Sequence, residues 1–318
     1  MDSVMIKKIG DMFRRAHNRT FRGFEKESNL VWKGPFRFIQ AADPQFGLID
    51  EFKYVNWDGP IDKAIRQSIE YKSRGAAVWD DEINLCKLAI EQWNRMIPKP
   101  KFVVVCGDLV NDFPGERQRS DQLNDFIETF SKIDQSIPLV LLPGNHDLLN
   151  QPTPKTVADY CSKFGDDYFS FWVDGVMFMV INVQYYKDST KTQQLAKEHD
   201  YWIDCQLKDI RNEKNNYKHV IVFQHIPWFT HHIDEPDDSI FNIAMEERKR
   251  MIKKFSSNGI RAIFAGHYHR NSCGRYEDLE IVVTSAMGAQ IGNSGDKSGY
   301  RIVDVDVDSI KHQYVSIE

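Results

Sequence analysis

Short runs of apolar residues recur along the chain, and each spans four to seven residues between polar or turn-forming segments. Runs of this length that are rich in Val, Ile and Phe are typical of strands buried on both faces. We expect such strands at 36–42, 102–106, 139–142, 220–223, 260–264 and 281–285.

Longer stretches between these runs have helical spacing. In 79–97, the residues Ile83, Ile90 and Trp93 fall on one face, as they do in an amphipathic helix. The same period predicts helices near 119–135, 192–213 and 243–257. The last of these is followed by Asn258-Gly259, a pair that favours the end of a helix.

The alternation of strands and helices predicts an α/β protein with right-handed crossovers. Two pairs of segments break the alternation: 168–173 and 176–182 flank the hairpin signal Asp174-Gly175, and 301–307 and 311–317 are joined at Asp308-Ser309. We therefore expect mixed sheets with helices outside and antiparallel strands at the edges. No repeat or Gly/Ser linker divides the sequence, which favours a single domain over residues 1–318.

Two segments stand apart from this pattern. Residues 1–33 are of mixed charge, and we expect them to be peripheral. The segment 46–79 is too long for an ordinary loop and contains Trp57 and Gly59-Pro60. We interpret it as an insertion near the functional site, either a substrate gate or a surface excursion.

Composition narrows the class of protein. Of the 318 residues, 42% are hydrophobic and 12% aromatic, which excludes a disordered or fibrous chain. The 41 Lys and Arg against 46 Asp and Glu give a net charge of −5 without a basic block, so we expect no nucleic-acid partner. No apolar run approaches 18 residues, and we expect no membrane insertion. Five cysteines without a CxxC pair, and the lack of an apolar leader, predict reduced thiols and a cytoplasmic location.

Polar side chains follow five of the predicted strands, at the point where each strand ends. They are Asp43 and Gln45, Asp108, Asn145 and His146, His225, and His267 and His269. Each motif alone is typical of a turn, because Gly, Asn and Asp favour turns. In open α/β sheets, however, ligands bind beyond the carboxyl ends of the strands, so five such motifs together indicate one site.

The residue types point to metal chemistry. Asp, Asn and His without a thiolate suit Mn, Fe, Zn or Mg rather than a structural cysteine site. Six ligands are too many for one tetrahedral ion and fit two divalent ions ~3.5–4 Å apart, bridged by a carboxylate. Such a pair activates a bridging water for in-line attack at phosphorus. This leaves His146 to protonate the leaving oxygen as general acid.

The order of these motifs resembles the calcineurin-like metallophosphoesterases, over residues 43–269. The matching motifs are Asp43, Gly107-Asp108, Gly144-Asn145-His146-Asp147, His225 and Gly266-His267-Tyr268-His269. The resemblance implies a β-sandwich of two mixed sheets flanked by helices. It implies that metal one binds Asp43, Asp108 and His269, and that metal two binds Asp108 as the bridge with Asn145, His225 and His267. It also implies that His146 is the general acid.

Longer strings at 32–36, 42–47, 165–172, 223–227 and 266–271 look like one branch of that family, whose members are regarded as cytoplasmic serine/threonine phosphatases. The chain also departs from the wider family. Gln45 stands where a His is most often found, and it is either a weaker, neutral metal ligand or a contact to substrate. The Asp that orients the catalytic His in the main serine/threonine phosphatases is missing, and Asp112 is a candidate replacement. Arg270, directly after the last ligand, is a candidate for binding the substrate phosphate.

Three functions follow from this pattern. The leading hypothesis is a metal-dependent phosphomonoesterase acting on phosphoserine or phosphothreonine of proteins, in which a metal-bridging hydroxide attacks and His146 protonates the leaving group. One alternative is a phosphodiesterase acting on nucleotides or phospholipid head groups. The other is a scaffold with a degraded metal site, which Gln45 favours and His146 argues against.

Overall fold

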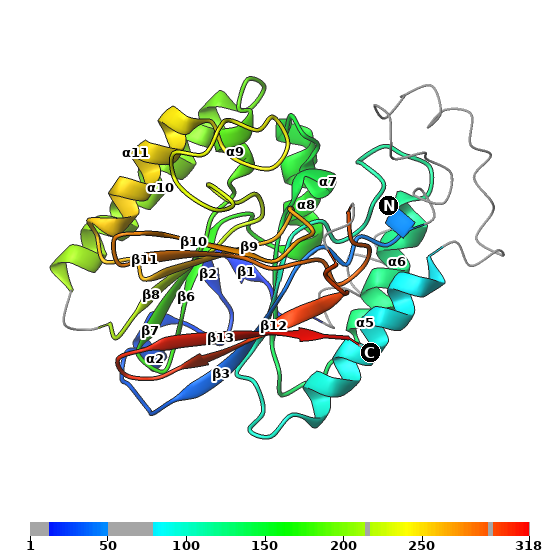
Figure 1. Cartoon of the computed structure of the whole chain (residues 1–318), viewed down its shortest axis with the longest axis horizontal. Helices are drawn as coiled ribbons and strands as arrows, with labels where there is room; N and C mark the ends of the chain where they lie inside the picture. Colours follow the sequence, from blue (N-terminus) through cyan, green and yellow to red (C-terminus); the bar gives the residue numbers. More distant parts are fainter. Residues whose placement is uncertain (1–12, 50–78, 214–216, 292–294, 318) are drawn as a thin grey trace.

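The computed structural model describes residues 13–49, 79–213, 217–291 and 295–317. Two β-sheets lie face to face, with helices on their outer faces (Figure 1). The larger sheet contains, in spatial order, β1 (Ala16–His17), β2 (Thr20–Phe21), β6 (Phe169–Val173), β7 (Val176–Val180), β8 (Val220–Phe223), β9 (Ala262–Ala265), β11 (Leu279–Val283) and β10 (Ser272–Tyr276). The smaller sheet contains β13 (Ile310–Ser316), β12 (Gly299–Val305), β3 (Phe36–Ala41), β4 (Val103–Cys106) and β5 (Leu139–Leu142).

Both sheets are mixed. In the smaller sheet β3, β4 and β5 run parallel, while β12 and β13 pair antiparallel at one edge. In the larger sheet β7, β8, β9 and β11 run parallel, and the hairpins β6–β7 and β10–β11 are antiparallel. The expected β-sandwich of two mixed sheets, with antiparallel pairs toward the edges, is confirmed.

The core between the sheets is aromatic. Phe38 of β3 stacks on Phe102 with ring centroids 4.9 Å apart, and Phe171 stacks on Phe178 of β7 at the same distance. Phe102 meets Phe178 edge-on at 5.1 Å, which ties the two stacks together. Each such pair contributes about 0.5–1.5 kcal/mol beyond the area it buries. This packing holds the carboxyl ends of strands from both sheets in a fixed relation.

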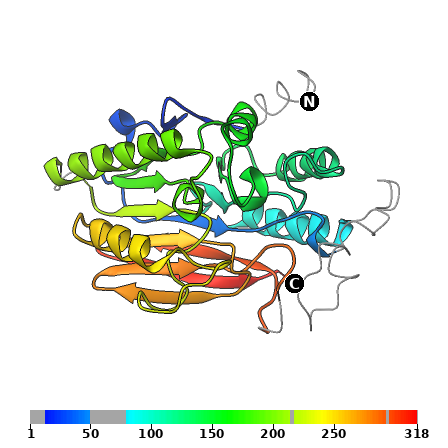
Figure 2. The same ribbon diagram turned by 90° about the horizontal axis from the view of Figure 1, so that it is seen from above.

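Helices cover the two outer faces (Figures 1 and 2). α10 (Gln193–Asn212) and α11 (Met245–Ser256) pack on the larger sheet, and α5 (Asp80–Arg95) and α6 (Arg119–Phe130) pack on the smaller one. These four confirm the predicted helices, although α6 ends five residues earlier than expected. α8 (Pro154–Phe164) was not predicted, and neither were the single turns α2 (Lys26–Asn29), α7 (Asn145–Leu148) and α9 (Gln184–Lys187).

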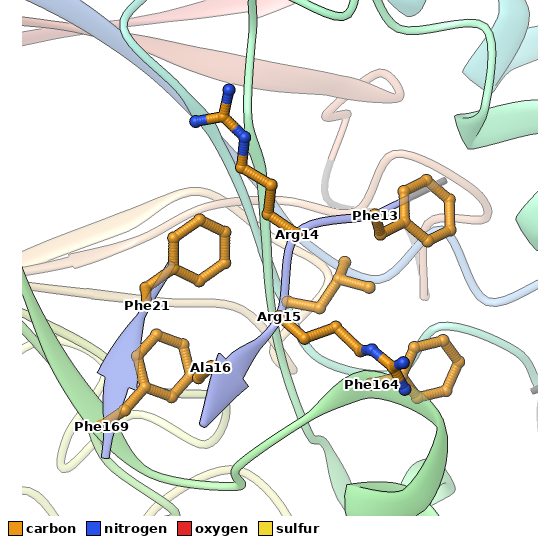
Figure 3. A pocket seen from close by; sticks show the side chains of 8 residues that line it. Phe13, Arg14, Arg15, Ala16, Phe21, Phe164 and Phe169 are labelled. Carbon is orange, nitrogen blue, oxygen red and sulfur yellow. The ribbon is translucent and has the colours of Figure 1, made fainter. Parts of the chain in front are cut away.

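The described part of the N-terminal segment lies at the edge of the larger sheet and also enters the core. Figure 3 shows the ring of Phe21 beside that of Phe169, with centroids 6.0 Å apart. Arg15 reaches the end of α8, where it donates to the carbonyl of Lys163 at 3.1 Å. The expectation of a peripheral segment did not include these core contacts, because strands of two residues leave no periodic pattern.

Residues 50–78 of the expected insertion lie outside the described residues, so its position near the site stays a prediction. The single-domain assignment and the cytoplasmic location likewise stay predictions. Among the helices of the described residues, none combines the length and the apolar composition needed to cross a membrane.

Candidate metal centre

The predicted site residues follow the carboxyl ends of strands from both sheets. Asp43, Asp108 and Asn145 come after the parallel neighbours β3, β4 and β5. His225 and His267 come after the parallel neighbours β8 and β9. Because the two sheets pack face to face, these ends meet, and the structure brings the two groups into direct contact.

The backbone at this edge is unusual. Ten non-glycine residues of the described part have a positive φ, and five of them are predicted site residues: Asp43, Gln45, Asp108, His267 and His269. A left-handed conformation is unfavourable for residues with a Cβ, and such positions concentrate at functional sites. The strained turns point these side chains inward instead of continuing the strands.

Glycines beside these residues make room for the ligand side chains. A Cβ on Gly144 would overlap the Asp108 carboxylate and lie 2.5 Å from the Asp108 backbone nitrogen. A Cβ on Gly107, which has φ +82°, would lie 2.6 Å from Nδ1 of His225. The glycines of the two motifs therefore serve close packing of the site as well as turn geometry.

Four side chains predicted to bind metal two converge on one point. Nε2 of His225 lies 3.1 Å from Oδ2 of Asp108, 3.1 Å from Oδ1 of Asn145 and 3.1 Å from Nδ1 of His267. The ligand atoms of Asp108, His225 and His267 all lie within 4.8 Å of one another, so this buried group could hold a metal ion. Asn145 is held by Asn150, whose Oδ1 accepts from Nδ2 of Asn145 at 2.9 Å, and this leaves the Asn145 oxygen facing the group.

The residues predicted to bind metal one lie alongside. Oδ1 of Asp43 is 3.6 Å from Nε2 of His269 and 3.9 Å from Nδ1 of His225. This oxygen is buried and accepts no hydrogen bond, although the other carboxylate oxygen accepts from the backbone N–H of His267 at 2.8 Å. A buried carboxylate oxygen without a donor is expensive unless a cation binds it. The site therefore fits a second cation.

Each candidate imidazole is fixed by a backbone carbonyl on its far side. Nδ1 of His225 lies 2.7 Å from the Cys106 oxygen, Nε2 of His267 lies 2.8 Å from the Ile240 oxygen, and Nδ1 of His269 lies 2.6 Å from the Ala289 oxygen. A carbonyl can only accept, so each of these nitrogens carries the proton. In His267 and His269 the other nitrogen then presents its lone pair to the cluster, as it does in metal sites, and Nε2 of His225 can do so once its own proton is displaced.

The electrostatics of the cluster also suit cations. Burial lowers the pKa of His267 to about 3 and that of His269 to about 4, so both rings are neutral ligands at neutral pH. Burial raises the pKa of Asp43 to about 8, which is the response of a carboxylate without a counter-ion. Burial alone would lower the pKa of His225, but Asp108 and Asp43 raise it to about 9. Without a metal ion, the proton on His225 thus balances the negative charge of Asp108 and Asp43, and a bound divalent ion could take over this role.

His146 lies at the rim of this cluster and is only partly buried. Its backbone N–H donates to Oδ1 of Asp108 at 2.8 Å, and its Nδ1 is hydrogen-bonded to the carbonyl of Asn111. Phe113 stacks on the ring with centroids 4.3 Å apart and planes 14° apart. Nε2 is therefore the nitrogen that remains for a substrate.

The suggestion that Asp112 orients His146 is wrong. The Asp112 carboxylate instead accepts from the backbone N–H of Gln118 at 2.8 Å and from the side chain of Gln122 at 3.0 Å. A backbone carbonyl, that of Asn111, takes the orienting role.

Gln45 and Arg270 have different surroundings. The Gln45 amide donates from Nε2 to Oδ1 of Asn111 at 3.2 Å, and its buried Oε1 receives no hydrogen bond. That oxygen fits a neutral metal ligand. Arg270 lies over the ring of Tyr268, at 5.4 Å from the centroid, and donates to the Ile291 carbonyl at 3.3 Å. No hydrogen bond joins it to the ligand cluster within the described ranges, so its role in binding phosphate stays a prediction.

Sequence reasoning missed several residues that support the site. The loop 230–242 folds around the buried carboxylate of Glu235 and supplies the Ile240 carbonyl to His267. Arg119, which is 9% exposed, contacts the backbone of His146. Glu235 and Arg119 are charged residues in polar stretches of the sequence, and nothing in the local pattern indicates that they are buried or support the site. Asn150, which orients Asn145, lies five residues after it, and an asparagine at that position is equally typical of a turn.

Comparisons with known proteins identify the family of the chain. The family model described as "Calcineurin-like phosphoesterase" matches residues 37–271. A protein of Rattus norvegicus named serine/threonine-protein phosphatase CPPED1 is 45% identical over 308 residues, which cover 97% of this chain and 92% of that protein. The Homo sapiens protein of the same name is 43% identical over 311 residues, covering 98% and 93%.

Solved structures show the same fold at low sequence identity. Purple acid phosphatase PPD1 from yellow lupin (Lupinus luteus) seeds matches with a TM-score of 0.58 at 13% identity, covering 89% of this chain and 51% of that one. GAP50, the anchor in the inner membrane complex of Plasmodium, matches with a TM-score of 0.57 at 12% identity, covering 90% and 86%. At this identity the likeness concerns the fold alone.

Proposed function

The chain belongs to the calcineurin-like phosphoesterase family, and from that premise we propose that it is a metal-dependent phosphomonoesterase acting on phosphoserine and phosphothreonine of proteins. The observation that carries the hydrolytic part is the buried cluster of Asp108, His225 and His267, beside which Oδ1 of Asp43 lacks a hydrogen-bond donor. The names of the relatives support the protein-substrate part.

The donor set fits two divalent ions of the Mn, Fe, Zn or Mg type. Asp43, Asp108 and His269 would hold one, with the Gln45 oxygen as a further neutral ligand; Asp108, Asn145, His225 and His267 would hold the other. Bound ions would supply Lewis acidity toward phosphoryl oxygens. The protein contributes preorganisation, because the carbonyls of Cys106, Ile240 and Ala289 already fix the three rings.

His146 would act as the general acid. Its Nδ1 is engaged by the Asn111 carbonyl, so Nε2 can pass a proton to the serine or threonine oxygen that leaves phosphorus. The phenyl ring of Phe113 shields one face of the imidazole and limits its rotation. A leaving alkoxide needs this proton much more than a leaving nitrophenolate does.

The proposal is tested by turnover of a phosphoserine peptide, p-nitrophenyl phosphate and bis-p-nitrophenyl phosphate with added Mn, Mg, Zn or Fe. We expect hydrolysis of both monoesters, and loss of peptide hydrolysis in His146→Ala and Asp108→Asn while the fold is retained. Asp278→Asn, at a side chain that is 87% exposed, is the matched control. Faster turnover of the diester would favour the phosphodiesterase alternative, and an inert, metal-free protein would favour the scaffold.

A further inference from the structure

Arg119 is a buried cation close to the proposed general acid. It is the first residue of α6 and is 9% exposed. Its Nη1 donates to the carbonyl of His146 at 2.9 Å and to the carbonyl of Asp112, and its Nη2 donates to the carbonyl of Asp147 at 3.4 Å. The same Nη2 lies 3.7 Å from Oδ1 of Asp147. One guanidinium thus joins the segment that follows β4 to the segment that follows β5.

These two segments together determine where the His146 ring lies. The segment after β4 contributes the Asn111 carbonyl, which holds Nδ1, and the Phe113 ring, which stacks at 4.3 Å. The segment after β5 carries His146 itself. Any change in the spacing of the two segments therefore moves the ring relative to its hydrogen-bond acceptor and its stacking partner.

We propose that Arg119 is a positioning residue for the general acid: by clamping the two segments, its guanidinium holds Nε2 of His146 on the leaving oxygen of the substrate. This rests on the proposed phosphomonoesterase function. Arginine suits the task better than lysine, because its planar fork donates to several carbonyls at once and stays charged when buried. Its described hydrogen bonds all go to backbone carbonyls, and none goes to the side chain of a proposed metal ligand.

The proposal predicts a selective defect. Misplacement of a catalytic group by about 1 Å can slow a reaction ~10²-fold. Loss of general acid catalysis slows expulsion of a poor leaving group, whereas p-nitrophenolate departs without a proton. An Arg119 variant should therefore resemble a His146 variant: hydrolysis of a phosphoserine peptide falls about 10²-fold, and that of p-nitrophenyl phosphate falls only a few-fold.

The experiment measures kcat and KM on both substrates for wild type, Arg119→Gln, Arg119→Lys and His146→Ala. Arg117→Gln, at the exposed arginine two residues earlier, is the matched control and should behave as wild type. Elemental analysis checks that all variants keep the metal content of wild type. Arg119→Lys retains the charge without the fork, and we expect an intermediate, equally selective loss in kcat with little change in KM.

A second readout does not depend on turnover. With Mg²⁺ as a diamagnetic ion, the ¹⁵N spectrum of the His146 imidazole should show a protonated Nδ1 in wild type and tautomer averaging in Arg119→Lys and Arg119→Gln. Equal slowing of both substrates by the Arg119 variants, or an unchanged imidazole spectrum, overturns the positioning role. If His146→Ala slows both substrates equally, His146 is not the general acid and the proposed function is wrong on this point. A changed imidazole spectrum in the Arg119 variants would still show that Arg119 positions this ring.

Discussion

Glu235 offers a sharp test of how the loop 230–242 supports the site. The residue is 7% exposed, and its carboxylate accepts from the backbone N–H of Thr230 at 2.8 Å, that of His231 at 2.8 Å and the side chain of Asn242 at 2.9 Å. The fully buried Arg248 lies beside it and donates to the Glu235 carbonyl at 3.0 Å. The carboxylate thus joins three residues of the loop through hydrogen bonds.

The loss of stability expected in Glu235→Gln follows from these hydrogen bonds. In Glu235→Gln one acceptor oxygen becomes an amide NH₂ that faces the N–H donors, so at least two charge-assisted bonds are lost. Each is worth about 1.5–3 kcal/mol, and we expect the free energy of unfolding to fall by about 3–6 kcal/mol. Because the Ile240 carbonyl of this loop holds His267, divalent-metal affinity should also fall about tenfold.

The pH dependence gives the substitution a signature. Burial alone would raise the pKa of Glu235, but its N–H donors lower it below the ordinary value. The stabilisation is therefore complete above the unfolded pKa of 4.5 and is lost as the pH falls through the folded pKa. Urea unfolding of Glu235→Gln should show a large deficit at pH 7 and a smaller one in acid.

Glu246→Gln, at an exposed glutamate in the first turn of α11, is the control and should change the stability by less than about 0.5 kcal/mol. The reasoning is refuted if Glu235→Gln unfolds within that same margin of wild type at pH 7, or if its deficit is the same at all pH values.

Three further predictions concern packing, protonation and a ligand's orientation. Gly144→Ala should displace the Asp108 carboxylate and lower turnover at least ~10²-fold, because the added methyl overlaps it. His199 is fully buried, its Nε2 accepts the N–H of Asn182, and burial lowers its pKa to about 4. Because the unfolded histidine takes up a proton first, stability should fall by about 3 kcal/mol from pH 6.5 to 4, and His199→Gln should flatten this slope in urea unfolding. Asn150→Ala removes the acceptor that turns the Asn145 oxygen inward, and should weaken divalent-metal binding about tenfold by calorimetry.

Each of these has a result that would contradict it. In Gly34→Ala the added methyl meets open space at a backbone φ of +106°, so this variant should lose stability but keep the turnover of the folded protein. A loss of turnover equal to that of Gly144→Ala would remove the steric argument for Gly144. An unchanged acid slope in His199→Gln would show that another group carries it. Metal affinity in Asn150→Ala within twofold of wild type would mean that Asn145 needs no partner to present its oxygen.

The fold was largely predictable because buried strands and amphipathic helices leave periodic patterns. The strand expected at 139–142 was found at Leu139–Leu142, and those expected at 260–264 and 281–285 were found within two residues as Ala262–Ala265 and Leu279–Val283. β10 (Ser272–Tyr276) escaped prediction because it is a short edge strand with alternating exposure and a central glycine. α8 escaped although Thr153 caps it and Pro154 opens it, since both also favour turns.

The positions of the candidate ligands were predictable from a topological rule, because polar residues that follow parallel strands meet at one edge. Their supports were not. The carbonyls that fix the rings belong to Cys106, Ile240 and Ala289, and a backbone carbonyl has no residue signature. Arg119 lies 27 residues from the His146 carbonyl that it holds, so only the folded chain reveals this contact. The donors to Glu235 lie within seven residues of it, but most of them are backbone N–H groups, which have no residue signature either.

The central claim is that the cluster holds divalent ions for phosphoester hydrolysis, with Asp108 shared between two positions. Elemental analysis of the purified protein, with turnover of a phosphoserine peptide measured on the same sample, tests it most directly. The account predicts two divalent ions per chain in wild type, and loss of both metal and turnover in Asp108→Asn. A wild-type chain without metal, or an Asp108→Asn protein that keeps its ions and its turnover, would contradict it.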